Sequence, residues 1–251
     1  VRWVESPDGP VRVRIFRHVS GGPQPSLIYI HGGAWTQGSP ETHWDITSRI
    51  ASWNRQTVIS IDYAKAPEYP FPTAINQCAS VVEWAFSNAA ELGLDREKIT
   101  LGGDSAGANI AAALTLKFRD TKRQILALLL IYPVCDFDYS RPSYAENHDG
   151  PLLKVAGMGA VRAMYCPNPE DLENPLVAPL LAPDHSNLPP TFVAVAEHDP
   201  LRDSGLAYAD ALRHANVPVE VDPGTGLIHG YLRAMEYCRA SEAGLKRMAN
   251  W

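Results

Sequence analysis

The chain has 251 residues, of which 45% are hydrophobic and 20% are charged. A chain of this size suits one globular domain that buries about 70–75% of its unfolded surface. Its 28 acidic and 22 basic residues give a net charge of −6 with histidine neutral. No long run of either sign occurs, so nothing in the sequence indicates the basic face that a nucleic-acid partner needs, and we expect no such partner. No apolar run approaches the roughly 20 residues of a membrane-spanning helix, so we expect no membrane span.

Four cysteines are too few to predict a disulfide scaffold in a chain of this size. None forms a C-x-x-C pair, and their spacing fits no zinc site. The chain begins with Val1 and not with methionine, so the lack of a signal peptide proves little. We expect a cytoplasmic protein and leave secretion open. A homodimer is compatible with the sequence.

Strands and helices alternate along most of the chain, which predicts an α/β fold with a mostly parallel sheet flanked by helices. Residues 11–16 alternate apolar and basic side chains, as expected of a half-exposed antiparallel strand near an edge. Short apolar segments predict further strands at 27–30, 57–61, 99–101, 125–132, 191–196 and 217–221. Amphipathic or alanine-rich stretches predict helices at 41–54, 71–94, 108–116, 202–215 and 231–248.

The segment 135–190 interrupts this alternation. It holds many prolines, three glycines and no clear strand, with one expected helix near 155–165. Ligands of open α/β sheets bind outside the carboxyl ends of the strands. We therefore interpret this segment as a lid or pocket wall inserted into a single domain that spans residues 1–251.

A serine lies between the strand at 99–101 and the next helix. Residues 103–107 read Gly-Asp-Ser-Ala-Gly, which matches Gly-x-Ser-x-Gly in the order strand, turn, helix. The two glycines allow a sharp turn, and the start of the helix supplies free N–H groups beside Ser105. The motif predicts that Ser105 is a nucleophile. Taken alone, it also fits a glycine-rich helix start with an incidental serine.

A serine nucleophile needs a base, and the base needs a carboxylate that orients it. His229 lies in the loop between the last expected strand and the last expected helix, at the sheet edge of Ser105. Asp199 follows another buried strand and directly precedes a proline, which disfavours a helical position. We therefore expect His229 as base and Asp199 as carboxylate, with Glu197 as the rival carboxylate.

The tetrahedral intermediate of acyl transfer needs N–H donors for its oxyanion, and loss of one donor costs about 2.7–4 kcal/mol. We expect one donor from the backbone of Ala106, the residue after the nucleophile. Gly32 and Gly33 follow the strand at 27–30 and are the other expected donors. The alternative for this glycine pair is a plain turn.

Together these residues resemble the hormone-sensitive-lipase-like branch of the α/β-hydrolases, the bacterial family IV type. Nucleophile, acid and base follow one another in the order of that fold. The resemblance runs from about residue 27 to the final helix. The matching segments are His-Gly-Gly-Ala at 31–34, a proline-rich loop at 62–72, Gly-Asp-Ser-Ala-Gly at 103–107, Asp-Pro-Leu-Arg-Asp at 199–203 and His-Gly-Tyr at 229–231.

The resemblance implies a serine carboxylesterase that acts on a small-molecule ester through Ser105, Asp199 and His229, without a metal or an organic cofactor. Two features depart from the family pattern. Ala34 replaces the third glycine of the family motif, which puts a third donor there in doubt. The sequence before the first strand is short, so we expect a reduced cap, an open site and a preference for acetyl to butyryl groups.

Three aromatic residues that follow strands, Trp35, Tyr63 and Tyr132, are candidate substrate-binding residues, although packing fits them equally well. The same machinery also suits a lactone hydrolase, an amidase or a deacetylase of acetylated sugars, because the pocket reads the leaving group. An alternative of another class is a non-catalytic small-molecule receptor. The presence of all three triad residues argues against it.

Overall fold

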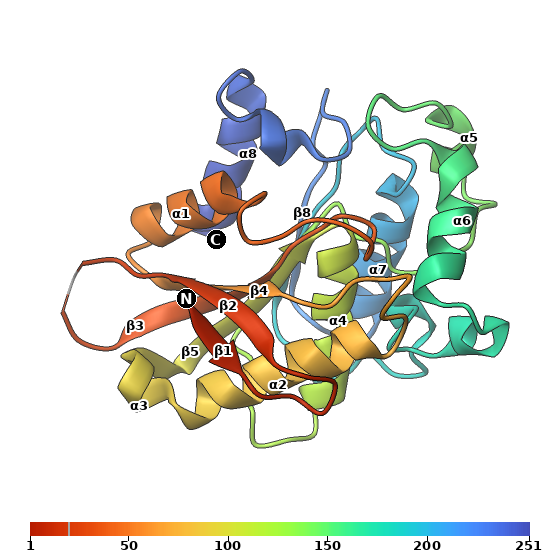
Figure 1. Cartoon of the computed structure of the whole chain (residues 1–251). Helices are drawn as coiled ribbons and strands as arrows, with labels where there is room; N and C mark the ends of the chain where they lie inside the picture. The colour runs from red at the N-terminus through yellow and green to blue at the C-terminus, as the bar shows by residue number, and fades with distance from the viewer. Residues whose placement is uncertain (20) are drawn as a thin grey trace.

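The computed structural model describes residues 1–19 and 21–251. Within these ranges one eight-stranded sheet forms the centre of the molecule (Figure 1), in the order β1-β2-β4-β3-β5-β6-β7-β8. The strands are β1 (Arg2–Val4), β2 (Val11–Phe16), β3 (Gln24–Ile30), β4 (Thr57–Asp62), β5 (Leu94–Asp104), β6 (Leu128–Ile131), β7 (Thr191–Ala194) and β8 (Val219–Asp222).

The sheet is parallel over most of its width. β2 pairs antiparallel with β1 and β4, and every other pair of neighbouring strands is parallel. The carboxyl ends of β3 to β8 therefore meet along one edge of the sheet. The predicted α/β class is confirmed, and β1 is an edge strand that the sequence pattern did not indicate.

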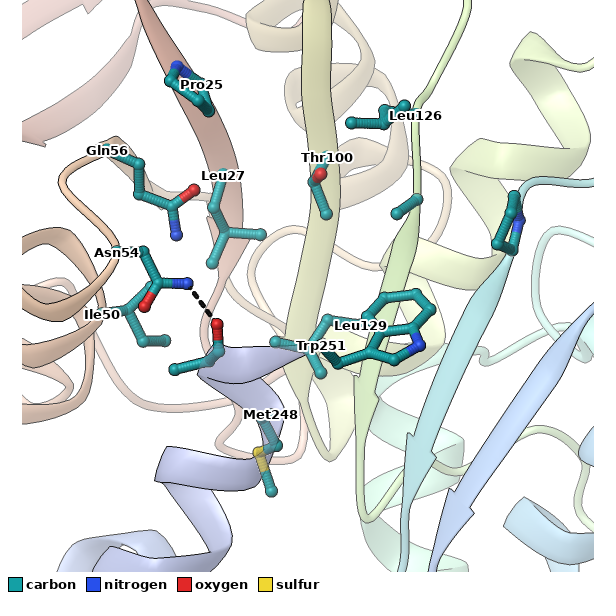
Figure 2. Close-up of a pocket in the computed structure, with 13 residues that line it drawn as sticks. Pro25, Leu27, Ile50, Asn54, Gln56, Thr100, Leu126, Leu129, Met248 and Trp251 are labelled. Carbon is teal, nitrogen blue, oxygen red and sulfur yellow. Dashed lines mark hydrogen bonds between the residues drawn. The ribbon is translucent and has the colours of Figure 1, made fainter.

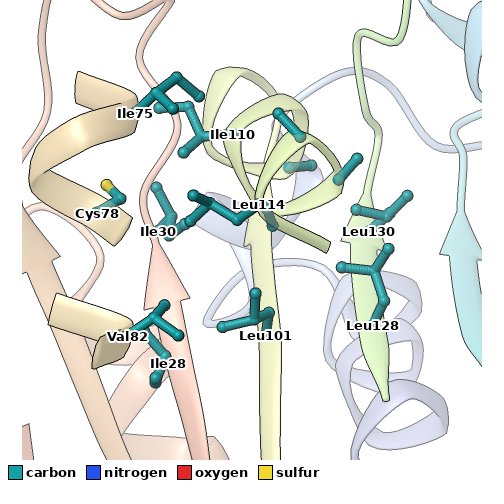
Figure 3. Close-up of a cluster of buried hydrophobic side chains, with 14 of the residues drawn as sticks. Ile28, Ile30, Ile75, Cys78, Val82, Leu101, Ile110, Leu114, Leu128 and Leu130 are labelled. Atoms are coloured by element: carbon teal, nitrogen blue, oxygen red, sulfur yellow. The ribbon is translucent and has the colours of Figure 1, made fainter. Parts of the chain in front are cut away.

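Side chains alternate between the two faces of the sheet along β3 and β6. Even-numbered positions pack against α2 (Thr73–Ser87) and α4 (Ala106–Phe118), as Figure 3 shows. Odd-numbered positions pack against α1 (Trp44–Trp53) and α8 (Arg239–Asn250). Because a fully buried Leu or Ile stabilises the fold by about 1.5–3 kcal/mol, this alternation fixes the register of the strands. The face in Figure 3 is formed by Ile28, Ile30, Leu101, Leu128, Leu130, Ile75, Cys78, Val82, Ile110 and Leu114.

The expected helix at 71–94 is interrupted. α2 ends at Ser87, and the side-chain amide of the next residue, Asn88, donates to the carbonyl oxygen of Trp84 at 2.8 Å. Such a side chain competes with the backbone hydrogen bonds of a helix. A short helix, α3 (Ala89–Leu92), follows and ends at Gly93, whose φ of 62° is left-handed.

The expected closing helix at 231–248 is also divided. A 3-10 turn, η3 (Tyr231–Ala234), comes first, and α8 begins only after Cys238, which is extended with φ −127° and ψ 107°. Tyr231 and Leu232 of η3 are buried against the α1 face of the sheet. The side chains of η3 therefore complete this part of the hydrophobic core before α8 begins.

The segment between β6 and β7 carries α5 (Pro142–Glu146), α6 (Val155–Tyr165), η1 (Pro169–Glu173) and η2 (Pro179–Leu181). It lies beyond one end of the sheet, at the right of Figure 1. α7 (Arg202–His214) then follows β7. No helix in the described ranges combines the length and apolar character that a bilayer crossing requires.

Candidate active site

Ser105 occupies the sharp turn between β5 and α4. Its backbone has φ 54° and ψ −119°, a combination that residues other than glycine rarely adopt. The neighbouring glycines make this turn possible, since a Cβ on Gly103 or Gly107 would collide with the carbonyl oxygen of Ile30 in β3. The turn leaves Ser105 half-buried, above the carboxyl edge of the sheet.

His229, in the loop after β8, and Asp199, in the loop after β7, converge on Ser105. The Nε2 atom of His229 lies 3.0 Å from Ser105 Oγ, and its Nδ1 atom lies 2.7 Å from Asp199 Oδ2. The carboxylate accepts the Nδ1–H proton, so these partners assign the tautomer in which Nε2 accepts from the serine hydroxyl. The three residues form the hydrogen-bonded array of a Ser–His–Asp triad.

The carboxylate of Asp199 is fully buried and held from two sides. Its Oδ1 atom accepts from the N–H of Leu201 at 2.8 Å, while Oδ2 faces His229. The rival carboxylate, Glu197, is exposed and accepts from the N–H of Gly226 at 2.7 Å. The imidazole therefore pairs with Asp199.

Three backbone N–H groups beside the nucleophile, those of Gly33, Ala34 and Ala106, have no acceptor within the described part of the chain. Ala106 is the first residue of α4, where an N–H has no partner in its own helix. The N–H of Gly32, by contrast, donates to Asp104 Oδ1 at 2.8 Å. The expectation that Gly32 supplies an oxyanion donor is therefore wrong, since its proton is already committed, and Ala34 takes its place as a candidate.

Asp104 is a buried carboxylate with donors on several sides. It accepts from Tyr29 Oη at 2.8 Å, from the N–H of Gly32 and, at 3.5 Å, from Tyr132 Oη, and His43 Nε2 lies 3.4 Å away. Burial alone raises the pKa of Asp104, but His43 and these hydrogen bonds outweigh it and hold that pKa well below its usual range. The ionised carboxylate thus ties β3 and the loop after it to β5.

A cavity of about 220 Å³ opens beside Ser105. The loop after β3 forms one side of it and the 135–190 insertion forms another. Trp35 lies in its wall, as expected, and stacks on Tyr165 of α6 with ring centroids 4.4 Å apart. The apolar wall consists of Trp35, Val134, Phe137, Tyr139, Leu153, Met158, Val161 and Leu201.

Known proteins share this architecture. The family described as alpha/beta hydrolase fold matches residues 27–233, which is most of the chain. The chain belongs to the α/β-hydrolase family.

Several relatives of the chain are named esterases. The chain is 40% identical to carboxylesterase NlhH of Mycobacterium tuberculosis, over 87% of this chain and 70% of that protein. It is 41% identical to an arylesterase of Saccharolobus solfataricus, over 90% of this chain and 74% of that protein. A thermophilic carboxylesterase from a metagenomic library superposes with a TM-score of 0.96 at 32% identity, over 99% of this chain and 86% of the other. These matches confirm the predicted hormone-sensitive-lipase-like resemblance, the fold and the carboxylesterase class.

Two of the three aromatic residues expected to bind substrate do not line the cavity of this hydrolase. Tyr63 is fully buried, and its hydroxyl donates to the carbonyl oxygen of His31 at 2.9 Å. Tyr132 is buried beneath the triad, where its ring lies 4.8 Å from that of His229. Neither ring reaches the cavity, because Tyr63 packs against the loop after β3 and Tyr132 packs against the ring of His229.

A second pocket of about 470 Å³ lies between α1, α8 and the sheet of the hydrolase (Figure 2). Its lining includes Leu27, Ile50, Leu129, Met248 and Trp251, and none of its lining residues is ionisable. It therefore holds no candidate base or acid. In the described ranges, no group of three or more His, Cys, Asp or Glu side chains is placed to hold a metal ion.

The apolar residues of the insertion were missed as site residues. Phe137, Leu153, Met158 and Val161 have no sequence feature that separates a pocket wall from an ordinary core. One signal was available for α6. Nine of its eleven residues are Val, Ala, Gly or Met, although the helix lies in a proline-rich segment without strands. An apolar helix in an insertion that contributes no strand is well suited to line an apolar cavity.

Proposed function

We propose that this hydrolase cleaves short-chain carboxylic esters through an acyl-enzyme on Ser105. The observation that carries the proposal is the continuous hydrogen-bonded path from Asp199 Oδ2 to His229 Nδ1, at 2.7 Å, and from His229 Nε2 to Ser105 Oγ, at 3.0 Å. Both distances lie within reach of proton transfer.

In the first half of the reaction, Ser105 Oγ attacks the ester carbonyl while His229 Nε2 takes the hydroxyl proton. The buried carboxylate of Asp199 stabilises the imidazolium that forms. The carbonyl oxygen gains negative charge in the tetrahedral intermediate. The N–H groups of Gly33, Ala34 and Ala106 receive this charge in our proposal, because they have no acceptor among the residues that the structure describes.

The intermediate collapses when His229 gives its proton to the leaving alkoxide, which departs as the alcohol and leaves the acyl group on Ser105. Water then enters, loses a proton to His229 and attacks the acyl carbonyl. The second intermediate expels Ser105, which regains its proton from His229, and the carboxylic acid leaves. Each proton that His229 accepts is returned in the next step.

The cavity supports a short acyl group. Its lining includes Ala34 and Ala106, which carry candidate oxyanion donors, and does not include His229. The imidazole must face the leaving oxygen, so the cavity on the other side of Ser105 is suited to the acyl group. Its 220 Å³ is below the roughly 300–1,000 Å³ of pockets that bury drug-sized ligands.

A substrate panel with an active-site probe tests the proposal. The panel contains p-nitrophenyl esters from two to twelve acyl carbons, lactones, anilides and acetylated sugars. We expect the highest kcat/KM for acetate or butyrate esters, and covalent labelling of Ser105 by an organophosphonate. Faster cleavage of the twelve-carbon ester refutes the short-chain preference, and faster cleavage of lactones, anilides or sugars assigns another acyl substrate. Absence of both turnover and labelling favours a non-catalytic receptor.

A further inference from the structure

The loop that carries Asp199 is held by side chains from α5, a helix of the insertion. Ser143 Oγ donates to the carbonyl oxygen of Pro200 at 2.7 Å. Asn147 Nδ2 donates to the carbonyl oxygen of Asp199 itself at 3.4 Å. The insertion therefore contacts the backbone of the catalytic acid and of the residue that follows it.

The starts of α5 and α7 also cap each other. The N–H of Ser143, in the first turn of α5, donates to Asp203 Oδ2 at 2.8 Å. The N–H of Asp203, in the first turn of α7, donates back to Ser143 Oγ at 3.3 Å. N–H groups in a first helical turn have no partner in their own helix. The exchange satisfies one donor of each helix and fixes the two helices relative to each other.

Burial makes the hydroxyl of Ser143 hard to replace. Ser143 and Asp199 are both fully buried, so bulk water does not compete for these contacts. Loss of the hydroxyl removes a donor from the buried carbonyl of Pro200 and an acceptor from the N–H of Asp203. The nearby ion pair between Arg202 and Glu146 is more exposed and contributes less.

We propose that Ser143 is a positioning residue, which holds the acid loop through Pro200 so that the carboxylate of Asp199 meets His229 in reactive geometry. The inference rests on the proposed function of the triad. Small displacements of a catalytic group are costly, and one of about 1 Å lowers rates by up to 100-fold. The insertion thus has two tasks, because α6 lines the acyl cavity while α5 anchors the acid.

The test compares Ser143→Ala with Ser140→Ala. Ser140 is an exposed serine of the same insertion, and its hydroxyl donates to Asp138, two residues away. For p-nitrophenyl butyrate we expect S143A to lower kcat at least 10-fold with KM changed less than threefold, measured well below the unfolding temperature. We expect S140A to keep kcat and KM within twofold of the wild type.

A spectroscopic readout separates positioning from a loss of stability. The proton between His229 Nδ1 and Asp199 Oδ2 gives a far-downfield proton NMR resonance when the pair is well formed. We expect this resonance to shift or broaden in S143A and to stay unchanged in S140A. A merely structural role predicts a lower unfolding temperature, with the resonance and kcat unchanged in the protein that remains folded.

Retention of wild-type kcat and of the resonance in folded S143A overturns the inference. If S143A does not fold, Asn147→Ala removes the milder contact with Asp199, and the same two readouts apply, with at least a threefold loss of kcat expected. An unchanged resonance and kcat in N147A then overturns the inference. Failure of the inference is distinguishable from failure of the proposed function, because the latter is tested by labelling of Ser105 and ester turnover in the wild type.

Discussion

The N–H of Gly32 donates a hydrogen bond of 2.8 Å to the carboxylate of Asp104, the residue directly before Ser105. This contact joins the loop after β3 to the nucleophile turn after β5. The free N–H groups of Gly33 and Ala34 follow immediately in the same loop. The contact with this buried carboxylate thus helps to position the N–H groups of Gly33 and Ala34 relative to Ser105.

Replacing that carboxylate with an amide tests its role. Asp104→Asn removes the negative charge, which weakens the hydrogen bonds that Tyr29 and the N–H of Gly32 both donate to Oδ1. We expect kcat to fall about 10- to 100-fold with little change in KM, because a misplaced oxyanion donor affects mainly the transition state. Tyr29→Phe keeps the carboxylate and removes one donor, so its loss of kcat should be smaller. Steady-state kinetics of both folded variants measure these losses. Equal losses of kcat in the two variants would contradict a special role for the carboxylate of Asp104.

Removing the nucleophile gives the simplest test of the triad. Ser105→Ala deletes the hydroxyl that faces His229 at 3.0 Å and leaves the apolar surroundings intact. We expect kcat to fall by several orders of magnitude while the circular dichroism spectrum and the unfolding temperature stay close to those of the wild type. Activity within tenfold of the wild type is incompatible with Ser105 as the nucleophile.

Two methionines of α6 form a matched pair for acyl-chain selection. Met158 lines the cavity beside Ser105, whereas Met164 is 41% exposed and is not part of that lining. Met158→Ala enlarges the cavity by a flexible side chain, so we expect the preferred acyl chain to lengthen by about two carbons, since each methylene in an apolar pocket contributes about 1–3 kcal/mol. Met164→Ala should leave the chain-length profile unchanged. Profiles of kcat/KM against acyl length measure both, and a shift in M164A alone contradicts the assigned wall.

A pH-dependent loss of stability is expected from His31. Its imidazole is buried, which lowers its pKa from 6.5 to about 3, and neighbouring His43 and Lys65 act in the same direction while Asp104 opposes them. Between these values the unfolded chain binds a proton that the folded protein does not, so stability falls as pH drops from about 6.5 towards 3, by up to about 1.4 kcal/mol per pH unit.

Urea unfolding at pH 7, 6, 5 and 4 measures this contribution. In His31→Gln the decline over this range should be shallower than in the wild type. His214→Gln replaces an exposed histidine at the end of α7 and serves as the control, which should follow the wild-type curve. Parallel curves for wild type and H31Q would show that other groups cause the acid sensitivity.

The sequence predicted what depends on local pattern. Ser105, His229 and Asp199 each follow a parallel strand, and the carboxyl ends of parallel strands meet at one edge, so their proximity followed from the strand order of the fold. The candidate oxyanion donors were predicted less well. Nothing local to Gly32 indicates that its N–H is used by a residue 72 positions away.

The errors in the pocket and the helices have similar causes. Tyr63 and Tyr132 both follow strands, and whether such a ring enters the cavity or packs beneath it depends on the loops that cover it. The interruption of the 71–94 helix at Asn88 was marked by a residue that competes with the helix backbone and by Gly93 soon after. These two residues indicate a break, but the apolar face of the segment 71–94 is continuous, and this periodicity alone predicts one long helix.

Apart from Leu201, the apolar cavity wall comes from two separate parts of the chain. Trp35 belongs to the loop after β3, whereas Leu153, Met158 and Val161 belong to one contiguous segment between β6 and β7. A chimera that imports this segment from another member of the family would change the accepted acyl group without altering the nucleophile turn. The exchanged segment would have to include Ser143 and Asn147. An exchange that starts at α6 would combine a new cavity wall with the original contacts between α5 and the Asp199 loop.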